Sequence, residues 1–244
     1  MSERRGWLSY YRPWMAWTIL IVLVLGVGGF AATRSELLDV DRVQVQLSGD
    51  GPLSEAEVVA VVGVPLGTPM TAVDLDALVG RVGELAYAAE VVAEREWPGT
   101  IRVWVAVRLP VVNAVEPGGL VSLLDSGGTV IEHVAHTNPI LPIIRVDGFG
   151  GLGSRVPRIN PLLRAAGAVT PDLGAWILAL VPVGGGVRAE LVGGVVVDLG
   201  IGEDYVDEMR SLATVLTKVE LMCLESIDVT IPQNPVVVRS ATGC

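Results

Sequence analysis

The feature that most constrains this chain is an uncharged apolar run near its start, from Met15 to Ala32. At about 1.5 Å of rise per residue, a helix of roughly 18 residues is about 27 Å long, close to the hydrocarbon thickness of a bilayer. We therefore expect this run to cross a membrane once as a helix. The rest of the chain must then fold on either side of that helix.

The flanks of the apolar run predict its orientation. Arginines lie within residues 4–12, and Trp and Tyr residues gather at the same boundary. Because positive flanks stay in the cytoplasm, we expect a cytoplasmic tail, residues 1–14, and an extracytoplasmic remainder. A cleaved secretory signal is the alternative, since Ala31 and Ala32 supply small residues at the end of the run, but the apolar cores of signal peptides are usually shorter, about 7 to 15 residues.

Charge and cysteine content narrow the class of protein. The chain carries a formal net charge of -10 at pH 7, whereas proteins that bind nucleic acid need basic patches to neutralise phosphates. We therefore expect no nucleic-acid partner. The two cysteines, Cys223 and Cys244, are too few for a disulfide framework, and whether they pair is left open.

The stretch after the apolar run predicts a small α+β domain. Residues 43–47 alternate apolar and polar side chains, as in a half-buried strand. Ser54 and Glu57 have the spacing of a capping box, and Asp74 precedes a helix with a single apolar stripe. Two helices are therefore expected after the first strand.

A β-hairpin closes this domain. Residues 94–110, EREWPGTIRVWVAVRLP, form two extended segments around Pro98 and Gly99. In the second segment apolar residues alternate with others such as Arg102 and Trp104, so one face packs on the helices and the other meets water. The predicted order is strand, helix, helix, strand, strand. On the outward face, Trp104 either packs beneath a loop or anchors a partner, since exposed aromatic side chains are enriched at binding hot spots.

From Val111 onwards the sequence predicts a second domain of mainly antiparallel strands. Short apolar strands are separated by glycine pairs that suit tight hairpin turns. Two helices interrupt them, one opening at Asn160 and Pro161 and one from Glu203 to Lys218. The last strand, Val236–Arg239, is expected at a sheet edge, where free backbone groups invite pairing with another chain.

These patterns together give an α+β fold with a single N-terminal transmembrane helix, a βααββ domain and a mainly antiparallel β-domain with two helices. No catalytic group stands out near the hairpin, which favours a binding module over an enzyme. The expected segments are a cytoplasmic tail 1–14, a transmembrane helix 15–32, a linker 33–39, a first domain 40–110, a β-domain 111–240 and a C-terminal tail 241–244.

Several short motifs follow one another in a characteristic order. They are Val43–Gly49, Ser54–Glu55, Gly67–Met70, Arg95–Pro98 with Thr100–Val107 and Pro110, Leu124–Gly128, Leu141–Ile144 with Gly148, and Ile227–Val238. This order, which spans nearly the whole chain, resembles that of the FtsQ/DivIB family of single-pass bacterial division proteins. Two positions depart from the family, Val107 where a glutamate is frequent and Ala93 where a larger β-branched residue is usual.

The resemblance implies a POTRA domain followed by a β-domain outside the cytoplasm, on a protein of the bacterial plasma membrane with its N-terminus inside. It implies a scaffold of the division septum that recruits FtsB-like and FtsL-like proteins and helps control septal peptidoglycan synthesis. Other division proteins would bind through the POTRA domain. We expect no enzymatic activity, no cofactor, no metal and no small-molecule substrate.

The resemblance also implies where partners bind. In this family the last strand of the β-domain receives a partner segment, and the preceding helix assists. The residues that we assign to partner binding are therefore Tyr205, Met209, Leu212, Ile231, Val236, Val237, Val238 and Arg239, with Trp104 on the hairpin of the first domain.

A membrane-anchored or secreted envelope hydrolase is the alternative function, with His133 or His136 in the catalytic role. A metal site normally needs three or more ligands, and the chain has no other histidine. Asp125 and Ser126 are typical of a hairpin turn rather than of a catalytic triad. Residues 148–153 fit the letters G-x-G-x-x-G, but prolines shortly after them obstruct the helix that a dinucleotide site requires.

Overall fold

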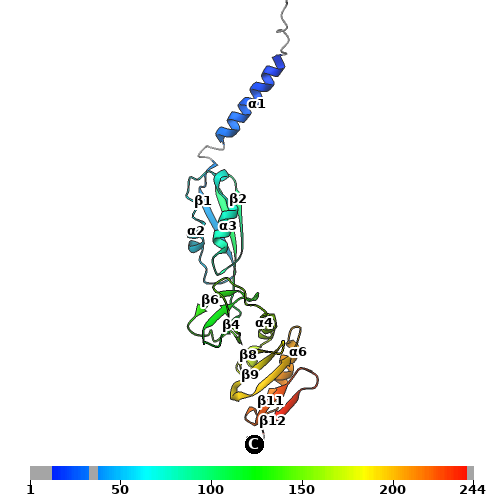
Figure 1. The fold of residues 1–244 in the computed structure, drawn as a ribbon. Coiled ribbons are helices and arrows are strands. Elements are labelled where there is room, and N and C mark those ends of the chain that lie inside the picture. Colours follow the sequence, from blue (N-terminus) through cyan, green and yellow to red (C-terminus); the bar gives the residue numbers. More distant parts are fainter. Residues whose placement is uncertain (1–12, 33–37, 241–244) are drawn as a thin grey trace, which may run out of the picture. The chain divides into compact units, whose positions relative to one another are not determined.

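Residues 13–32 and 38–240 of the chain are described by this computed structural model (Figure 1). The chain divides into two compact units. The first unit comprises residues 1–48, 54–82 and 90–105, and the second comprises residues 49–53, 83–89 and 106–244.

Helix α1 (Pro13–Ala32) coincides with the apolar run. Its described side chains are exposed. Among the residues whose placement is described, no helix is long and apolar enough to cross a membrane. The transmembrane segment 15–32 therefore stays a prediction. The expected tails 1–14 and 241–244 and the linker 33–39 lie wholly or largely outside the described residues.

The first unit confirms the predicted order of strand, two helices and two strands. Its sheet has the order β1-β3-β2, so the two hairpin strands are neighbours and β3 lies in the centre (Figure 1). The elements are β1 (Arg42–Ser48), α2 (Glu55–Val62), the 3₁₀ helix η2 (Met70–Ala72), α3 (Leu75–Gly83), β2 (Ala88–Glu96) and β3 (Thr100–Val107).

Local signals account for the two helices of this unit. The Ser54 hydroxyl oxygen accepts a hydrogen bond from the N–H of Glu57 (3.2 Å), and Asp74 accepts one from the N–H of Ala77 (3.0 Å). Both caps were predicted, and each satisfies a backbone donor that the helix itself leaves free. Gly63 ends α2 in the left-handed region, at φ 59°, which glycine reaches without a steric penalty.

The hairpin contributes the core of the unit. Ile101, Val103 and Val105 are fully buried, whereas Arg102 and Trp104 are partly exposed. The alternation predicted for β3 is therefore confirmed, because successive side chains of a strand point to opposite faces of the sheet.

Arg95 shows why a charged residue lies in this hairpin. Its guanidinium donates hydrogen bonds to the carbonyl oxygens of Met70 (2.9 Å) and Val73. These carbonyls belong to the turn before α3, and carbonyls that leave solvent need a donor. Arg95 thus fixes this turn against β2.

One nine-stranded sheet forms the second unit, in the order β12-β11-β10-β9-β8-β7-β4-β5-β6. Five of its eight pairings are antiparallel, which confirms the mainly antiparallel prediction. The strands are β4 (Val112–Val115), β5 (Val121–Leu124), β6 (Val130–Val134), β7 (Ile143–Arg145), β8 (Ile177–Val183), β9 (Gly186–Leu191), β10 (Val196–Gly200), β11 (Leu224–Asp228) and β12 (Val236–Arg239).

Helices connect two of the three parallel pairs of this sheet, and the third pair, β4 with β7, is connected through β5 and β6. Parallel strands need a crossover connection, and helices lie between β7 and β8 and between β10 and β11. Both predicted helices are present, and the four-residue α5 was not predicted. The remaining elements are α4 (Asn160–Gly167), α5 (Pro171–Gly174), η3 (Val192–Gly194), α6 (Val206–Leu216) and η4 (Leu221–Cys223).

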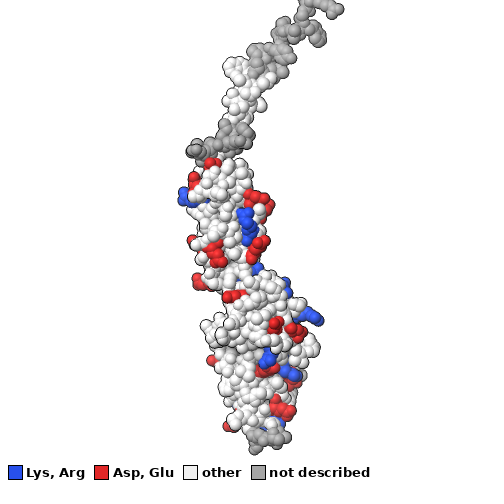
Figure 2. All heavy atoms as spheres, turned by 60° about the vertical axis from the view of Figure 1, so that its left-hand side comes forward, with Lys and Arg blue, Asp and Glu red and all other residues white. Residues whose placement is uncertain are grey.

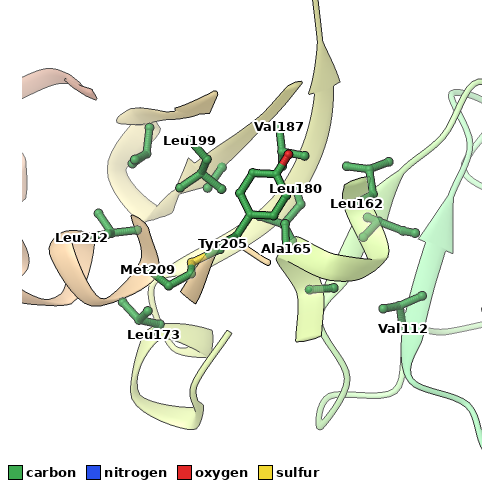
Figure 3. Close-up of a cluster of buried hydrophobic side chains, with 14 of the residues drawn as sticks. Val112, Leu162, Ala165, Leu173, Leu180, Val187, Leu199, Tyr205, Met209 and Leu212 are labelled. Carbon is green, nitrogen blue, oxygen red and sulfur yellow. The ribbon is translucent and has the colours of Figure 1, made fainter. Parts of the chain in front are cut away.

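The core of the second unit lies between these helices and the sheet. Tyr205 occupies its centre, fully buried, with Met209 of α6 and Ala165 of α4 nearby (Figure 3). Tyr205 adopts a left-handed φ of 61° directly before α6, and its hydroxyl donates to the carbonyl oxygen of Gly200 (3.3 Å). A non-glycine residue in this region is uncommon, so packing of the ring holds the backbone in place.

Tyr87, also in the second unit, gives the fold a specific pH dependence. Its hydroxyl donates to Glu132, and burial, together with this bond and the Glu132 charge, raises the pKa of Tyr87 from 10.0 to about 12. The folded chain holds this proton more tightly than the unfolded chain, so the stabilisation is complete below about pH 10 and is lost as pH rises through about 12.

We therefore expect the difference in unfolding free energy between the native chain and Tyr87→Phe to be constant up to about pH 10 and to change only above it. Urea unfolding at a series of pH values measures this difference. An ultraviolet titration in which Tyr87 ionises near its ordinary pKa would contradict the assignment.

Candidate partner-binding site

Strand β12 forms one edge of the nine-stranded sheet. Within the described residues it pairs only with β11, in an antiparallel ladder that places Val237 opposite Ile227. The N–H of Ser240 donates to the carbonyl oxygen of Cys223 (3.0 Å), so the backbone of Ser240 faces β11. Because this direction alternates along an antiparallel strand, the backbone groups of Val237 and Arg239 face the free edge.

The side chains of β12 lie where a partner strand can reach them. Val236 and Val238 are 52% and 45% exposed, and Arg239 is also exposed. Val237 points the other way and packs, half-buried, against the core. Ile231, in the turn before β12, is exposed. The predicted edge strand is therefore present, and each of these five assigned residues has surface available to a partner.

Hydrogen bonds fix the turn between β11 and β12. Asp228 accepts bonds from the N–H (2.9 Å) and the hydroxyl (2.7 Å) of Thr230, and these bonds hold the pKa of the Asp228 carboxyl below its usual range. The N–H of Asn234 donates to the carbonyl oxygen of Ile231 (2.9 Å). The entrance to β12 is thus ordered in the absence of a partner, which lowers the entropic cost of binding.

Helix α6 turns the residues that we assigned to partner binding toward the core. Tyr205, Met209 and Leu212 are all buried, so these three side chains have no surface to offer, and the assignment needs correction. The stripe that predicted the helix is apolar, and an apolar stripe on a surface helix faces the core. The polar face of α6 is the one that a partner can contact.

That polar face borders a shallow hollow of about 430 Å³ beside the β11–β12 turn. The walls combine charged side chains of α6 with prolines of the turn, so a bound segment meets both charge and rigid apolar surface. The lining residues are Asp207, Arg210, Ser211, Thr214, Lys218, Pro232, Gln233 and Pro235. No signal in the sequence marks this face, because polar residues on a helix do not by themselves distinguish a binding face from solvated surface.

Trp104, in the first unit, lies on the open side of its sheet. The ring is partly exposed, its Nε1–H donates to Gln46 (2.7 Å), and the Arg102 guanidinium lies 5.5 Å from the ring centroid. Both neighbours are strand residues, Gln46 on β1 and Arg102 on β3, so these contacts to Trp104 come from the sheet itself and not from a loop. Its assignment to partner binding stays a prediction.

Charged groups are dispersed over the surface. On the face shown in Figure 2, acidic and basic side chains occur in small groups separated by wide uncharged areas. This face therefore presents no continuous basic surface of the kind that binds nucleic acid.

Within the residues that it describes, the structure does not assemble a catalytic site around His133, the candidate residue of the alternative hydrolase. His133 lies within hydrogen-bond distance of the Ser122 hydroxyl (2.7 Å), but Ser122 is fully buried, so a substrate cannot reach that hydroxyl. The His133 ring also stacks on Phe149, with centroids 5.7 Å apart. Residues 148–153 form no helix start, since the next helix begins at Asn160. In the described part of the chain, no group of three or more His, Cys, Asp or Glu side chains is suited to a metal ion.

Cys223 is disulfide-bonded. The other cysteine of the sequence, Cys244, lies outside the described residues. Whether Cys223 pairs with Cys244 thus concerns a residue outside those that the structure describes.

Known proteins match both the first unit and most of the chain. Residues 43–106, which run from β1 into β3, match the POTRA domain of FtsQ type. Cell division protein FtsQ of Streptomyces venezuelae is 30% identical over 205 residues, covering 82% of this chain and 74% of that protein. The chain belongs to the FtsQ family. Its cell division relatives in this family thus confirm the resemblance seen in the order of the motifs.

Other FtsQ proteins show how far the likeness extends. FtsQ of Streptomyces coelicolor is 30% identical over 222 residues, covering 84% of this chain and 83% of that protein. FtsQ of Mycolicibacterium smegmatis is 26% identical over 206 residues, covering 84% of this chain but only 60% of that relative. These matches are more than 200 residues long, so they extend well beyond the POTRA domain.

Proposed function

We propose that this FtsQ-family chain is a membrane-anchored scaffold of the division septum, without enzymatic activity, that holds FtsB-like and FtsL-like proteins through the edge of β12. The observation that carries the proposal is the free edge itself, on which the backbone groups of Val237 and Arg239 face outward. In this way the scaffold helps control septal peptidoglycan synthesis.

Strand addition explains how such a site works. Main-chain hydrogen bonds to the added strand supply affinity, and pockets for alternate side chains supply specificity. On one face of β12 the added strand meets Val236 and Val238, and on the other it lies beside Val237 and the polar face of α6. Lys218, just beyond α6, provides positive charge for acidic side chains of the partner, whereas Arg210 is paired with Asp207.

The proposal extends to the rest of the chain. The uncharged sequence of α1 supports a single membrane anchor, with residues 1–14 in the cytoplasm and the POTRA domain (40–110) and β-domain (111–240) outside it. Trp104, on the open side of the POTRA sheet, is a second contact point for other division proteins.

The experiment that tests the edge is Val237→Pro. Proline removes the outward N–H and is tolerated on an edge strand where that N–H faces solvent. We expect the affinity for the extracytoplasmic segment of the FtsB-like protein to fall about tenfold, since a lost backbone hydrogen bond costs roughly 1 kcal/mol or somewhat more. Biolayer interferometry with the purified chain measures this affinity.

Val237→Ala is the matched control, because it shortens the side chain and keeps the N–H. It should lose much less affinity than Val237→Pro, while both variants keep the circular dichroism spectrum of the native chain. Equal affinities for the native chain and a folded Val237→Pro variant would place the interface elsewhere.

A further inference from the structure

In the nine-stranded sheet, β7 and β8 are the neighbouring strands with the fewest paired residues in the described structure. These parallel strands share a single residue pair, Ile144 with Leu180, whereas β8 and β9 pair along nearly their whole length. Strand β7 has three residues and β8 has seven. The carbonyl oxygen of Trp176 accepts from the N–H of Val192 and so faces β9. Because backbone groups alternate between the two sides of a strand, the backbone of Ile177, at the start of β8, faces the side of β7, where in the described structure it has no ladder partner.

The segment before β7 cannot pair with the start of β8, because its backbone groups are already hydrogen-bonded to other residues. The carbonyl oxygen of Pro142 accepts from the N–H of Asn113 (2.9 Å), and that of Leu141 accepts from the Asn113 side chain (2.8 Å). Pro142 has no N–H to offer. The hydrogen-bonding groups of this segment thus point to β4, away from β8.

A hollow of about 530 Å³ opens on this unpaired side. Its walls are residues 137–143 and six of the residues between 169 and 177. None of these lining residues is charged, although 18% of the chain is Asp, Glu, Lys or Arg. Uncharged walls select against charged ligands, because charge leaving water needs an opposite charge or strong hydrogen bonds. The lining residues are Thr137, Asn138, Pro139, Ile140, Leu141, Pro142, Ile143, Val169, Thr170, Pro171, Gly174, Ala175 and Ile177.

Buried hydrogen bonds hold one wall in place. Asn113 is fully buried, donates to the carbonyl oxygens of Asn138 (2.9 Å) and Leu141, and accepts from the N–H of Asn138 (2.7 Å). The loop fixed in this way leaves the Ile140 side chain 88% exposed at the rim of the hollow.

We propose that this hollow binds one extended, uncharged apolar segment of another polypeptide, which adds to the free start of β8. The uncharged lining selects the side chains of the segment, and the backbone N–H and carbonyl of Ile177, which face the hollow side, select an extended backbone that can pair with them. This site is separate from the β12 edge and does not depend on the function proposed for it.

A second copy of this chain is a poorer occupant. Its own exposed uncharged segment, residues 231–238, lies elsewhere on the same unit, so the contact would be head-to-tail and would build open chains of molecules rather than a closed pair. A lipid or detergent tail fits the apolar walls but leaves the backbone groups of β8 unsatisfied.

The test is a selection of random 12-residue peptides displayed on phage against the purified full chain, followed by affinity measurements on synthetic copies of the enriched peptides. We expect an uncharged apolar centre in the enriched peptides and slower amide hydrogen exchange at Ile177 when they bind. Ala175→Glu, which puts a charge into the lining, should weaken binding at least tenfold. Ala89→Glu, the same change at an exposed alanine outside the lining, should leave it unchanged.

Several results would overturn the proposal. One is an enriched set with charged centres, or no enriched peptide at all. Another is protection confined to β12, which would assign the peptides to the other edge. Peptides that bind Ala175→Glu as tightly as the native chain would exclude the hollow, provided that the variant unfolds at the native temperature. Self-association of the native chain that Ala175→Glu abolishes, without peptide binding, would make a second copy the occupant.

Discussion

Tyr205→Ala is expected to lower the free energy of unfolding of the chain by about 3–5 kcal/mol, the usual cost of deleting a buried aromatic side chain. The ring is fully buried in the core of the second unit, between α6 and the sheet (Figure 3). Its removal leaves a cavity among rigid neighbours and also frees the left-handed backbone that the ring holds in place. Urea unfolding followed by circular dichroism measures the change.

The variant Tyr205→Phe separates the contribution of the ring to stability from that of the hydroxyl. The hydroxyl bond to Gly200 is long, at 3.3 Å, so its loss should cost at most about 1 kcal/mol. A Tyr205→Ala variant that unfolds at nearly the native urea concentration, with an unchanged slope, would show that the ring does not organise this core.

Tyr205 also shows why a binding site could not be predicted from hydrophobic periodicity alone. Hydrophobic periodicity located α6 correctly, but periodicity reports the face that is buried, and we had assigned Tyr205, Met209 and Leu212 to a partner. The available face is polar, with Asp207 and Arg210 beside the turn, and polar residues on a helix do not by themselves distinguish a binding face from ordinary solvated surface.

Local signals predicted the elements of the first unit well because each acts within a few residues. The caps at Ser54 and Asp74 and the alternation around Val103 depend on neighbouring residues alone. Helix α5 was missed although Thr170 caps it and Pro171 follows in the first turn, because its four residues are too few for a hydrophobic period.

Strand partners were less predictable than strands. A short apolar run such as β7 or β10 predicts a strand but says nothing of its neighbour, so the parallel pairings of β4 with β7 and of β10 with β11 came only from the structure. The same holds for Asn113, whose role in fixing residues 138–141 depends on contacts about 25 residues away along the chain.

Asp125→Ala is expected to destabilise the chain by about 3 kcal/mol, the lower end of the range for breaking a buried ion pair, since its partner Arg108 keeps some exposure. One oxygen of Asp125 accepts from the N–H groups of Gly127 (2.9 Å) and Thr129 (2.8 Å), and the other accepts from Arg108 (2.6 Å). Alanine leaves all three donors without this acceptor, and Arg108, which also donates to Ala88 (3.1 Å), becomes an unpaired charge.

The variant Asp125→Asn shows how much of this loss of stability comes from the turn and how much from the ion pair. An amide oxygen can still accept from Gly127 and Thr129, but it has no charge for Arg108, so a stability between those of the native chain and Asp125→Ala is expected. If Asp125→Asn is as unstable as Asp125→Ala, the charge carries the effect. If Asp125→Asn matches the native chain, the turn carries it and the ion pair contributes little, as exposed pairs do.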